Sequence, residues 1–218
     1  MHDSPMASST DEYWEQRREI VPSPTESDAD SRRRLVLLVT VDDPDVLSAY
    51  SEIRDRLGTF ECVRPTPPDE LHITIKTFEP ASTAVDIADA TIQRAQAAIA
   101  DSIGDWGPFE TTFPQINLFP DVVYAEAESS GMLTELNRTL CRLPQTTTLA
   151  RDEGSYIPHL TLGYFAGNDE YHDFVDFIEE NRTLPFPTLS VDELALAVCT
   201  VTDARPPTYE ILDSYDLQ

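Results

Sequence analysis

Hydrophobic and polar positions follow two different periods along the chain from residue 35 onward. Short runs of apolar and β-branched residues are typical of strands, and an apolar residue at every third or fourth position is typical of helices. By this pattern strands are expected at 35–41, 60–65, 70–78, 108–119, 121–128, 146–151, 156–165 and 189–201, and helices at 43–58, 82–104, 129–143 and 168–182.

The order of these elements occurs twice, each time as strand, helix, strand, strand, helix. Two copies are too few to stack as a solenoid, so we expect one duplicated, two-lobed domain over residues 32–218. Residues 1–31 are rich in Ser, Pro, Asp and Glu and are expected to form a mobile acidic tail. Alternatively, a short helix around 11–21 docks onto the domain through Trp14 and Ile20.

Two of the expected strands carry the same short motif. They read LHITIKTF and PHLTLGYF, and their histidines, His72 and His159, are 87 residues apart at corresponding places in the repeat. Side chains on a strand alternate between its faces. His72 and Thr74 therefore share one face, as do His159 and Thr161, and the apolar residues between them point into a core.

Two histidines and two threonines on adjoining strands suit chemistry at a phosphoester. One neutral imidazole can accept a proton while a second, protonated one donates a proton, and threonine hydroxyls can donate hydrogen bonds to the phosphate oxygens. We expect no metal and no cofactor, since the sequence has no His-Glu-x-x-His motif and no carboxylates at metal spacing near either motif. There are two alternatives. The two histidines could bind zinc, or they could simply occupy a sheet surface without a chemical role.

Two further residues follow the motifs as candidate substrate contacts. Lys76 is the only lysine of the chain, and simple alternation puts it on the face of His72 and Thr74. It either attracts a phosphate or protects a strand edge. Tyr164 follows the second motif and could stack on a base. Arg32, Arg33 and Arg34 either bind a polyanion or, as we expect, mark the edge of the domain.

The paired motifs, HITIKTF and HLTLGYF, resemble the two signatures of the 2H phosphoesterase superfamily, the LigT-like RNA cyclic phosphodiesterases also called 2′-5′ RNA ligases. The resemblance implies an α+β fold with two pseudo-symmetric antiparallel sheets that face a central cleft, and helices outside. It implies that His72 and His159 are the acid–base pair and that Thr74 and Thr161 hold the phosphate. His159 would activate water and His72 would protonate the leaving oxygen, although either order fits the sequence.

The resemblance also implies substrates, which are 2′,3′-cyclic phosphates at RNA ends or on small nucleotides. Many cyclic phosphodiesterases of this family carry an arginine where this chain has Tyr164, so the preferred substrate is open. Two alternatives remain, namely 2′-5′ RNA ligation in the same cleft and a module that binds phosphorylated ends without turnover.

Charge changes the picture of partners. Forty acidic residues against fifteen basic ones give a net charge of −25, which resembles proteins of halophilic archaea. So negative a surface argues against a long nucleic-acid groove and favours a small fragment or one RNA end. We expect a monomer in the cytoplasm without membrane contact, because no apolar run is long enough to span a bilayer and three scattered cysteines suit a reducing compartment.

Overall fold

The structure is a computed structural model that describes residues 10–20, 22, 32–82, 87–104, 106–143, 146, 149, 152, 155–183, 186–202 and 205–218. No helix among the described residues is long and apolar enough to cross a membrane. The α-helices are α1 (Thr10–Glu19), α2 (Pro44–Leu57), α3 (Asp89–Ile103), α4 (Met132–Cys141) and α5 (Tyr171–Glu180), and a 3₁₀ turn, η1, covers Pro68–Glu70.

The strands form one curved antiparallel sheet and a separate two-stranded ribbon of β4 and β8. The order in the sheet is β10-β9-β1-β3-β7-β6-β5, and β2 pairs with β7. The strand bounds are β1 (Arg32–Thr40), β2 (Val63–Pro65), β3 (His72–Ser82), β4 (Phe109–Thr111), β5 (Ile116–Leu118), β6 (Val122–Glu126), β7 (His159–Phe165), β8 (Leu189–Val191), β9 (Glu193–Thr202) and β10 (Arg205–Asp216).

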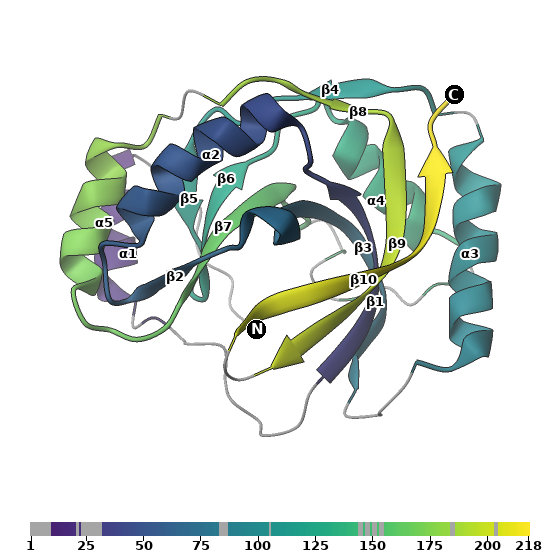
Figure 1. The fold of residues 1–218 in the computed structure, drawn as a ribbon, viewed down its shortest axis with the longest axis horizontal. Helices are drawn as coiled ribbons and strands as arrows, with labels where there is room; N and C mark the ends of the chain where they lie inside the picture. Colours follow the sequence, from purple (N-terminus) through teal and green to yellow (C-terminus); the bar gives the residue numbers. More distant parts are fainter. Residues whose placement is uncertain are drawn as a thin grey trace.

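Two lobes meet in the middle of this sheet. Strands β10, β9, β1 and β3 build the first lobe, and β7, β6, β5 and β2 build the second (Figure 1). The strands of the two lobes pair with each other at a single residue pair, Ile73 with Leu160. These residues are equivalent in the repeat, 87 positions apart, so the pseudo-two-fold axis passes between them. The expected bilobal α+β fold is confirmed, with the two expected sheets continuous at this one pair.

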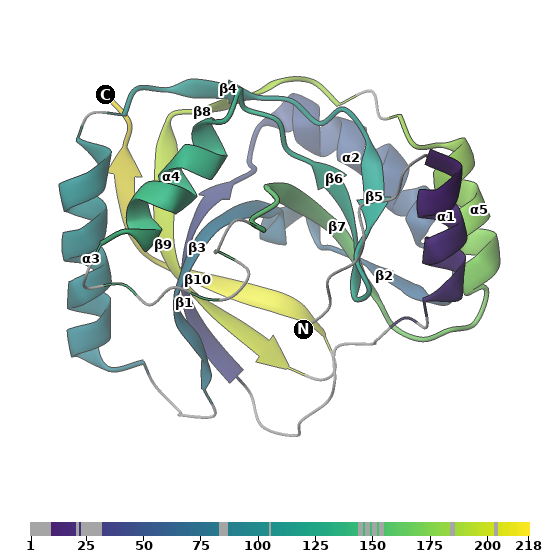
Figure 2. The ribbon, with the colours of Figure 1, turned by 180° about the vertical axis from the view of Figure 1, so that it is seen from behind.

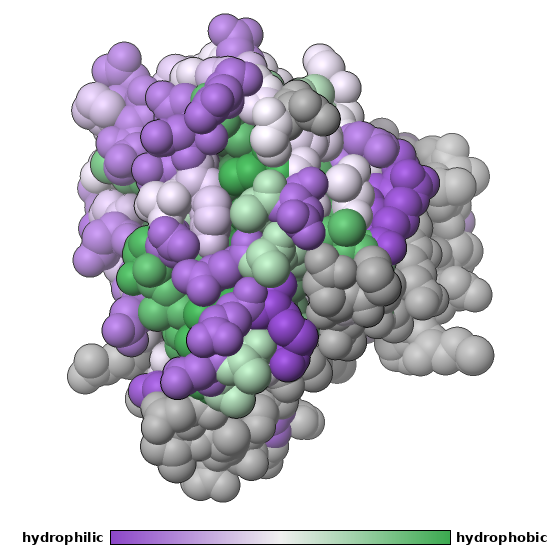
Figure 3. Space-filling model, turned by 90° about the vertical axis from the view of Figure 1, so that its right-hand side faces the viewer, coloured by the Kyte–Doolittle hydropathy of each residue, from purple (hydrophilic) through white to green (hydrophobic). Residues whose placement is uncertain are grey.

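Helices cover the outer side of the sheet. Figure 1 places α1, α2 and α5 toward the second lobe and α3 at the far edge of the first, and in the reverse view of Figure 2 α4 lies across β3 and β9. The largest core cluster lies between helices and sheet and includes Leu37, Ile73 and Leu162. On the face shown in Figure 3, around α3, hydrophilic residues dominate and hydrophobic ones appear in limited patches.

Local sequence signals explain where α2 begins and ends. The Asp43 carboxylate accepts hydrogen bonds from the backbone N–H groups of Asp45 and Val46, and Pro44 occupies the first turn, where no N–H is needed. Gly58 stands at the other end of the helix. Asp43, rather than the neighbouring Asp42, therefore forms the cap.

The N-terminal segment is docked wherever it is described. Trp14 on α1 is only 1% exposed, and Arg18 bonds to Asp176 and Glu179 on α5. The Tyr171 hydroxyl donates to the carbonyl of Arg17. The described part of this segment thus forms a helix over 10–19 that packs through Trp14, whereas residues 1–9, 21 and 23–31 of the expected mobile tail lie outside the described residues.

Several elements differ from the expected ones, among them β2, which is limited to Val63–Pro65, and the segment 189–201, which is divided into β8 and β9. The helix expected from residue 82 begins at Asp89, because β3 continues to Ser82. The strand expected at 108–119 is divided into β4 and β5. Strand β10, with prolines at positions 206 and 207, was not expected at all. The strand expected at 146–151 lies mostly outside the described residues.

Candidate active site

The four motif residues line one cavity between the lobes. Its volume is about 410 Å³, and His72, Thr74, His159 and Thr161 are all part of its wall. When the antiparallel register is continued outward from the central pair, each histidine comes to lie opposite the threonine of the other motif. Among the described residues, neither threonine hydroxyl has a protein partner, so both are available to a bound anion.

Each histidine is held by its own backbone in the same way. The Nδ1 atom of His72 lies 2.8 Å from the carbonyl oxygen of Glu70, and Nδ1 of His159 lies 2.8 Å from that of Ile157. A carbonyl only accepts, so Nδ1 carries a proton in both rings, and Nε2 is the nitrogen that gains or loses one. The two rings therefore present the same nitrogen for proton transfer.

The surroundings of the two histidines differ sharply. His72 is 8% exposed and packs against the ring of Tyr209, with 4.1 Å between ring centroids. Burial, and then the nearby His159, lower the pKa of His72 to about 4, against an opposing effect from the Glu70 carbonyl. His159 is less buried and contacts the edges of Phe119 and Tyr124.

A β-bulge interrupts each motif strand one residue after its threonine. Ile75 is the extra residue in β3 opposite β1, and Leu162 is the extra residue in β7 opposite β6. A bulge shifts the alternation of the side chains that follow. As a result Thr77 and its equivalent in the repeat, Tyr164, line the cavity.

The carbonyl groups of the two bulge residues are bound by equivalent residues on the helices. Asn137 on α4 donates from Nδ2 to the carbonyl of Ile75 at 2.8 Å, and the Tyr50 hydroxyl on α2 lies 3.0 Å from the carbonyl of Leu162. Asn137 and Tyr50 are themselves 87 positions apart. Bulges leave backbone groups outside the ladder, and buried backbone groups need partners. Each motif is thus braced by the helix that follows the first strand of the opposite repeat.

The expectation that Lys76 shares a face with His72 and Thr74 is wrong. The bulge at Ile75 reverses the alternation, so Lys76 pairs with Leu37 and points away from the cavity, where its side chain is fully buried. Its Nζ lies 2.6 Å from Oδ2 of Asp152. Burial, the largest single effect, would raise the pKa of Asp152, but the hydrogen bonds from Lys76, the Leu149 N–H and Asn137, together with the charge of Lys76, outweigh it and the pKa is lowered.

Two other residues of the cavity wall were not singled out from the sequence. Tyr209 comes from the unexpected strand β10, and its backbone N–H donates to the Glu70 carboxylate at 3.1 Å. Phe119 follows a strand without any motif. Arg34, from the arginine group expected at the edge of the domain, lies near the start of β1 and also lines the cavity, on the same face as Val36.

Metal ligands do not gather in the part of the chain that the structure describes. There, no three His, Cys, Asp or Glu side chains are placed to hold an ion together. His72 and His159 therefore lack a described third ligand of these types for the alternative zinc site.

Comparison with known proteins agrees with this architecture. Residues 41–201 match the 2′-5′ RNA ligase superfamily. An RNA 2′,3′-cyclic phosphodiesterase of Methanothermobacter thermautotrophicus is 26% identical over 162 residues, covering 72% of this chain and 84% of its own.

Solved structures share the fold at lower identity. The protein TT0787 of Thermus thermophilus has a TM-score of 0.64 at 20% identity, covering 84% of this chain and 97% of its own. The LigT protein of E. coli, complexed with 3′-AMP, has a TM-score of 0.56 at 19% identity, covering 86% and 99%.

The fold and the cavity define a two-lobed enzyme with one motif from each lobe at a shared site. The chain belongs to the 2′-5′ RNA ligase superfamily, the 2H phosphoesterases, and is an enzyme of the phosphoesterase type.

Proposed function

We propose that this protein hydrolyses 2′,3′-cyclic phosphates, at RNA ends or on small nucleotides, by a metal-independent reaction between two histidines. The observation that carries the proposal is the convergence of His72, Thr74, His159 and Thr161 on one cavity, with Nδ1 of both imidazoles held by a backbone carbonyl. The relative named as an RNA 2′,3′-cyclic phosphodiesterase supports this substrate class.

In this mechanism the two threonine hydroxyls donate hydrogen bonds to the non-bridging phosphate oxygens, where negative charge grows in the transition state. One histidine removes a proton from the attacking water, and the other protonates the ribose oxygen that leaves. The new P–O bond to water replaces the P–O bond to the ribose, and the product is a phosphomonoester.

The lowered pKa of His72 favours His72 as the base, which leaves His159 as the acid, the reverse of the order implied by the resemblance. At pH 7 a group with a pKa of about 4 is protonated in roughly one molecule in a thousand. His72 is therefore neutral in the free protein and ready to accept a proton. An activated substrate, a 2′-deoxynucleoside 3′-(4-nitrophenyl phosphate), tests this order, because it has no 2′-hydroxyl to replace water as the nucleophile and its leaving group needs no proton. His159→Ala should then be far less harmful than His72→Ala, and the opposite ranking would restore the first order.

The activity itself is tested with the four nucleoside 2′,3′-cyclic phosphates in EDTA and about 2 M KCl. We expect wild-type turnover and a loss of about 100-fold or more in kcat in His72→Ala and in His159→Ala. His172→Ala, on the exposed side of α5, is the matched control and should keep full activity. Turnover that requires added metal, or that survives both substitutions, contradicts the mechanism.

Ligation is the second candidate, since the superfamily is described by 2′-5′ RNA ligation. Incubation of RNA halves that end in a 2′,3′-cyclic phosphate and a 5′-hydroxyl distinguishes it, because a ligase yields a 2′-5′ joined product. A protein that only binds phosphorylated ends would keep its affinity in His159→Ala and show no turnover. The absence of a disulfide at Cys62, Cys141 and Cys199 supports a reducing compartment such as the cytoplasm as part of this proposal.

A further inference from the structure

Arg34 is the only arginine or lysine among the described residues that line the cavity. It lies on the same face of β1 as Val36 and Leu38, which alternate with Leu35 and Leu37 on the core side. Among the described residues no carboxylate lies within ion-pair distance of Arg34. The other cation near the cavity, Lys76, is already bound to Asp152.

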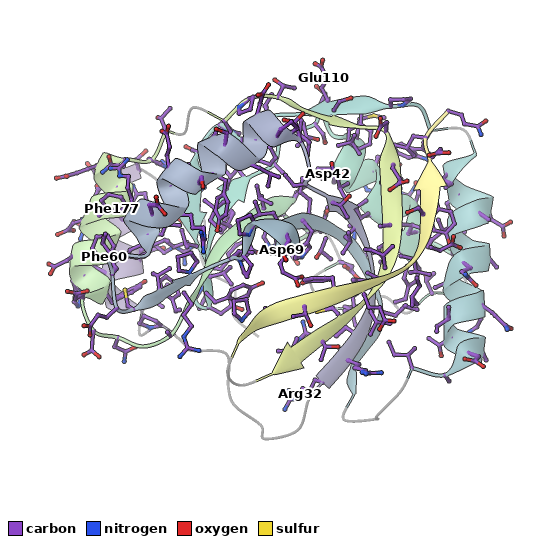
Figure 4. The ribbon with its side chains drawn as sticks, in the orientation of Figure 1. Arg32, Asp42, Phe60, Asp69, Glu110 and Phe177 are labelled. Carbon is purple, nitrogen blue, oxygen red and sulfur yellow. The ribbon has the colours of Figure 1, made fainter. Side chains whose placement is uncertain are left out.

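The charge of Arg34 acts on ionisable side chains on both sides of the cavity. Burial raises the pKa of the Tyr164 and Tyr209 phenols, and the positive charge of Arg34 opposes that rise in both. Tyr164 belongs to β7 of the second lobe. Tyr209 belongs to β10, and the Tyr209 ring packs on His72. Arg34 therefore faces the space between the lobes rather than the outer surface. Arg32, by contrast, stands at the free end of β1 (Figure 4).

Strand register separates Arg34 from the place where the reacting phosphate binds. Thr74 lies opposite Leu38, and Thr77 lies opposite Val36, one step further along the same face. Arg34 follows Val36, so its Cα atom is about 13 Å along β1 from that of Leu38 at the usual rise of a strand. A phosphate bound at Thr74 and Thr161 therefore does not occupy the Arg34 guanidinium, which is placed to bind a second anionic group of the same ligand.

We propose that Arg34 binds the phosphodiester on the 5′ side of the reacting nucleotide, so that this site selects RNA ends over cyclic mononucleotides. A mononucleotide has no such group, whereas every longer RNA has one. A guanidinium makes strong, charge-assisted hydrogen bonds to phosphate, and in a protein of net charge −25 it offsets the repulsion that an RNA end meets. The inference rests on the proposed function.

The test compares cytidine 2′,3′-cyclic phosphate with the dinucleotide ApC that ends in the same cyclic phosphate, in wild type, Arg34→Gln and Arg33→Gln. Arg33 carries the same charge on the opposite face of β1 and is the matched control. We expect Arg34→Gln to lower kcat/KM for the dinucleotide about 10- to 100-fold, mainly through KM. Turnover of the mononucleotide should change less than about threefold, and Arg33→Gln should change neither substrate.

A neutral methylphosphonate linkage in the same dinucleotide provides an independent check, since it removes the charge from the substrate. With this neutral dinucleotide, kcat/KM of the wild type should fall by the same factor that Arg34→Gln causes on the charged dinucleotide. The kcat/KM of Arg34→Gln itself should not fall further when the linkage is neutral. Equal losses on mononucleotide and dinucleotide, or none on either, overturn the proposal.

If the wild type turns over no cyclic phosphate at all, the proposed function fails. Calorimetric binding of ApC 3′-phosphate to the same three proteins then still decides the role of Arg34. Weaker binding in Arg34→Gln than in Arg33→Gln supports it, and equal affinities overturn it.

Discussion

His72 is buried and neutral, and its burial lowers the free energy of unfolding by an amount that depends on pH. Its pKa is about 4 in the folded protein against about 6.5 in an unfolded chain, so the folded state binds fewer protons in between. The free energy of unfolding therefore falls as the pH drops from 6.5 to 4, and the contribution of His72 to this loss is about 3 kcal/mol.

Replacement of His72 should remove this part of the pH dependence. Chemical denaturation of His72→Gln between pH 7 and 4 should give a curve that is flatter than that of wild type by about 3 kcal/mol. His172→Gln, on the exposed side of α5, should follow the wild type. A His72→Gln curve parallel to the wild-type curve would show that His72 is not the group that titrates.

Lys76 and Asp152 form a buried ion pair whose side chains are 0% and 3% exposed. Removal of one partner leaves an uncompensated buried charge, which usually costs about 3–5 kcal/mol. Lys76→Met should therefore lower the free energy of unfolding by that amount at pH 7. The double variant Lys76→Met, Asp152→Asn should recover most of the loss, because no charge then remains to be solvated. A double variant less stable than Lys76→Met would contradict this account.

At the scale of elements, the two bulges and the two helix residues that bind them set the shape of the site. Without the bulges, alternation would turn Thr77 and Tyr164 away from the cavity and put Lys76 into it. The position equivalent to Lys76 in the second repeat is Gly163, where a Cβ atom would come within 2.9 Å of a Val63 methyl group and 3.1 Å of the Arg64 carbonyl. The two repeats therefore share the bulge but fill the space behind it differently.

Tyr50→Phe tests the role of the braces. It removes one hydroxyl, which lies 2.5 Å from the carbonyl of Thr66 and 3.0 Å from that of Leu162. Loss of these bonds should lower the free energy of unfolding by about 1–3 kcal/mol. Because Leu162 follows Thr161, kcat should also fall several-fold while KM changes little. Tyr215→Phe, near the end of β10, is the control for a lost hydroxyl and should leave kcat unchanged. Unchanged kcat in Tyr50→Phe would limit Tyr50 to a structural role.

The motifs, their strands and the repeat could be predicted because they depend on local periodicity and on residue spacing. The side of the strand on which Lys76 lies could not, because a single extra residue at Ile75 decides it and nothing in the alternating pattern marks that residue. Strand β10 escaped prediction for a related reason. Pro206 and Pro207 argue against a strand, yet an edge strand tolerates missing N–H donors. Tyr209, which packs on His72, was missed along with it.

At the scale of the whole molecule, a large net charge acts on two lobes whose strands meet at one residue pair. The Asn137 side chain on α4 adds a hydrogen bond to the Ile75 carbonyl on β3, and one core cluster continues through both lobes. A net charge of −25 repels itself across such a junction when screening is weak.

Salt should therefore stabilise the protein strongly. The Debye length falls from about 8 Å at 0.15 M to about 3 Å at 1 M, which shortens the range of repulsion below the spacing of most surface charges. We expect the midpoint of thermal unfolding to rise by about 5–10 °C between 0.2 M and 2 M KCl, equivalent to a few kcal/mol for a chain of this size. Choline chloride at equal ionic strength should have nearly the same effect if screening is the cause.

Neutral substitutions separate screening from other effects of salt on the same protein. Glu52→Gln, Asp55→Asn and Glu110→Gln remove three exposed carboxylates, two on α2 and one on β4. The triple variant should unfold at a higher temperature than wild type at 0.2 M KCl and at the same temperature at 2 M, because the repulsion it relieves is already screened there. A midpoint that is independent of salt in wild type, or a triple variant that gains equally at both concentrations, would mean that net charge does not limit the stability of this fold.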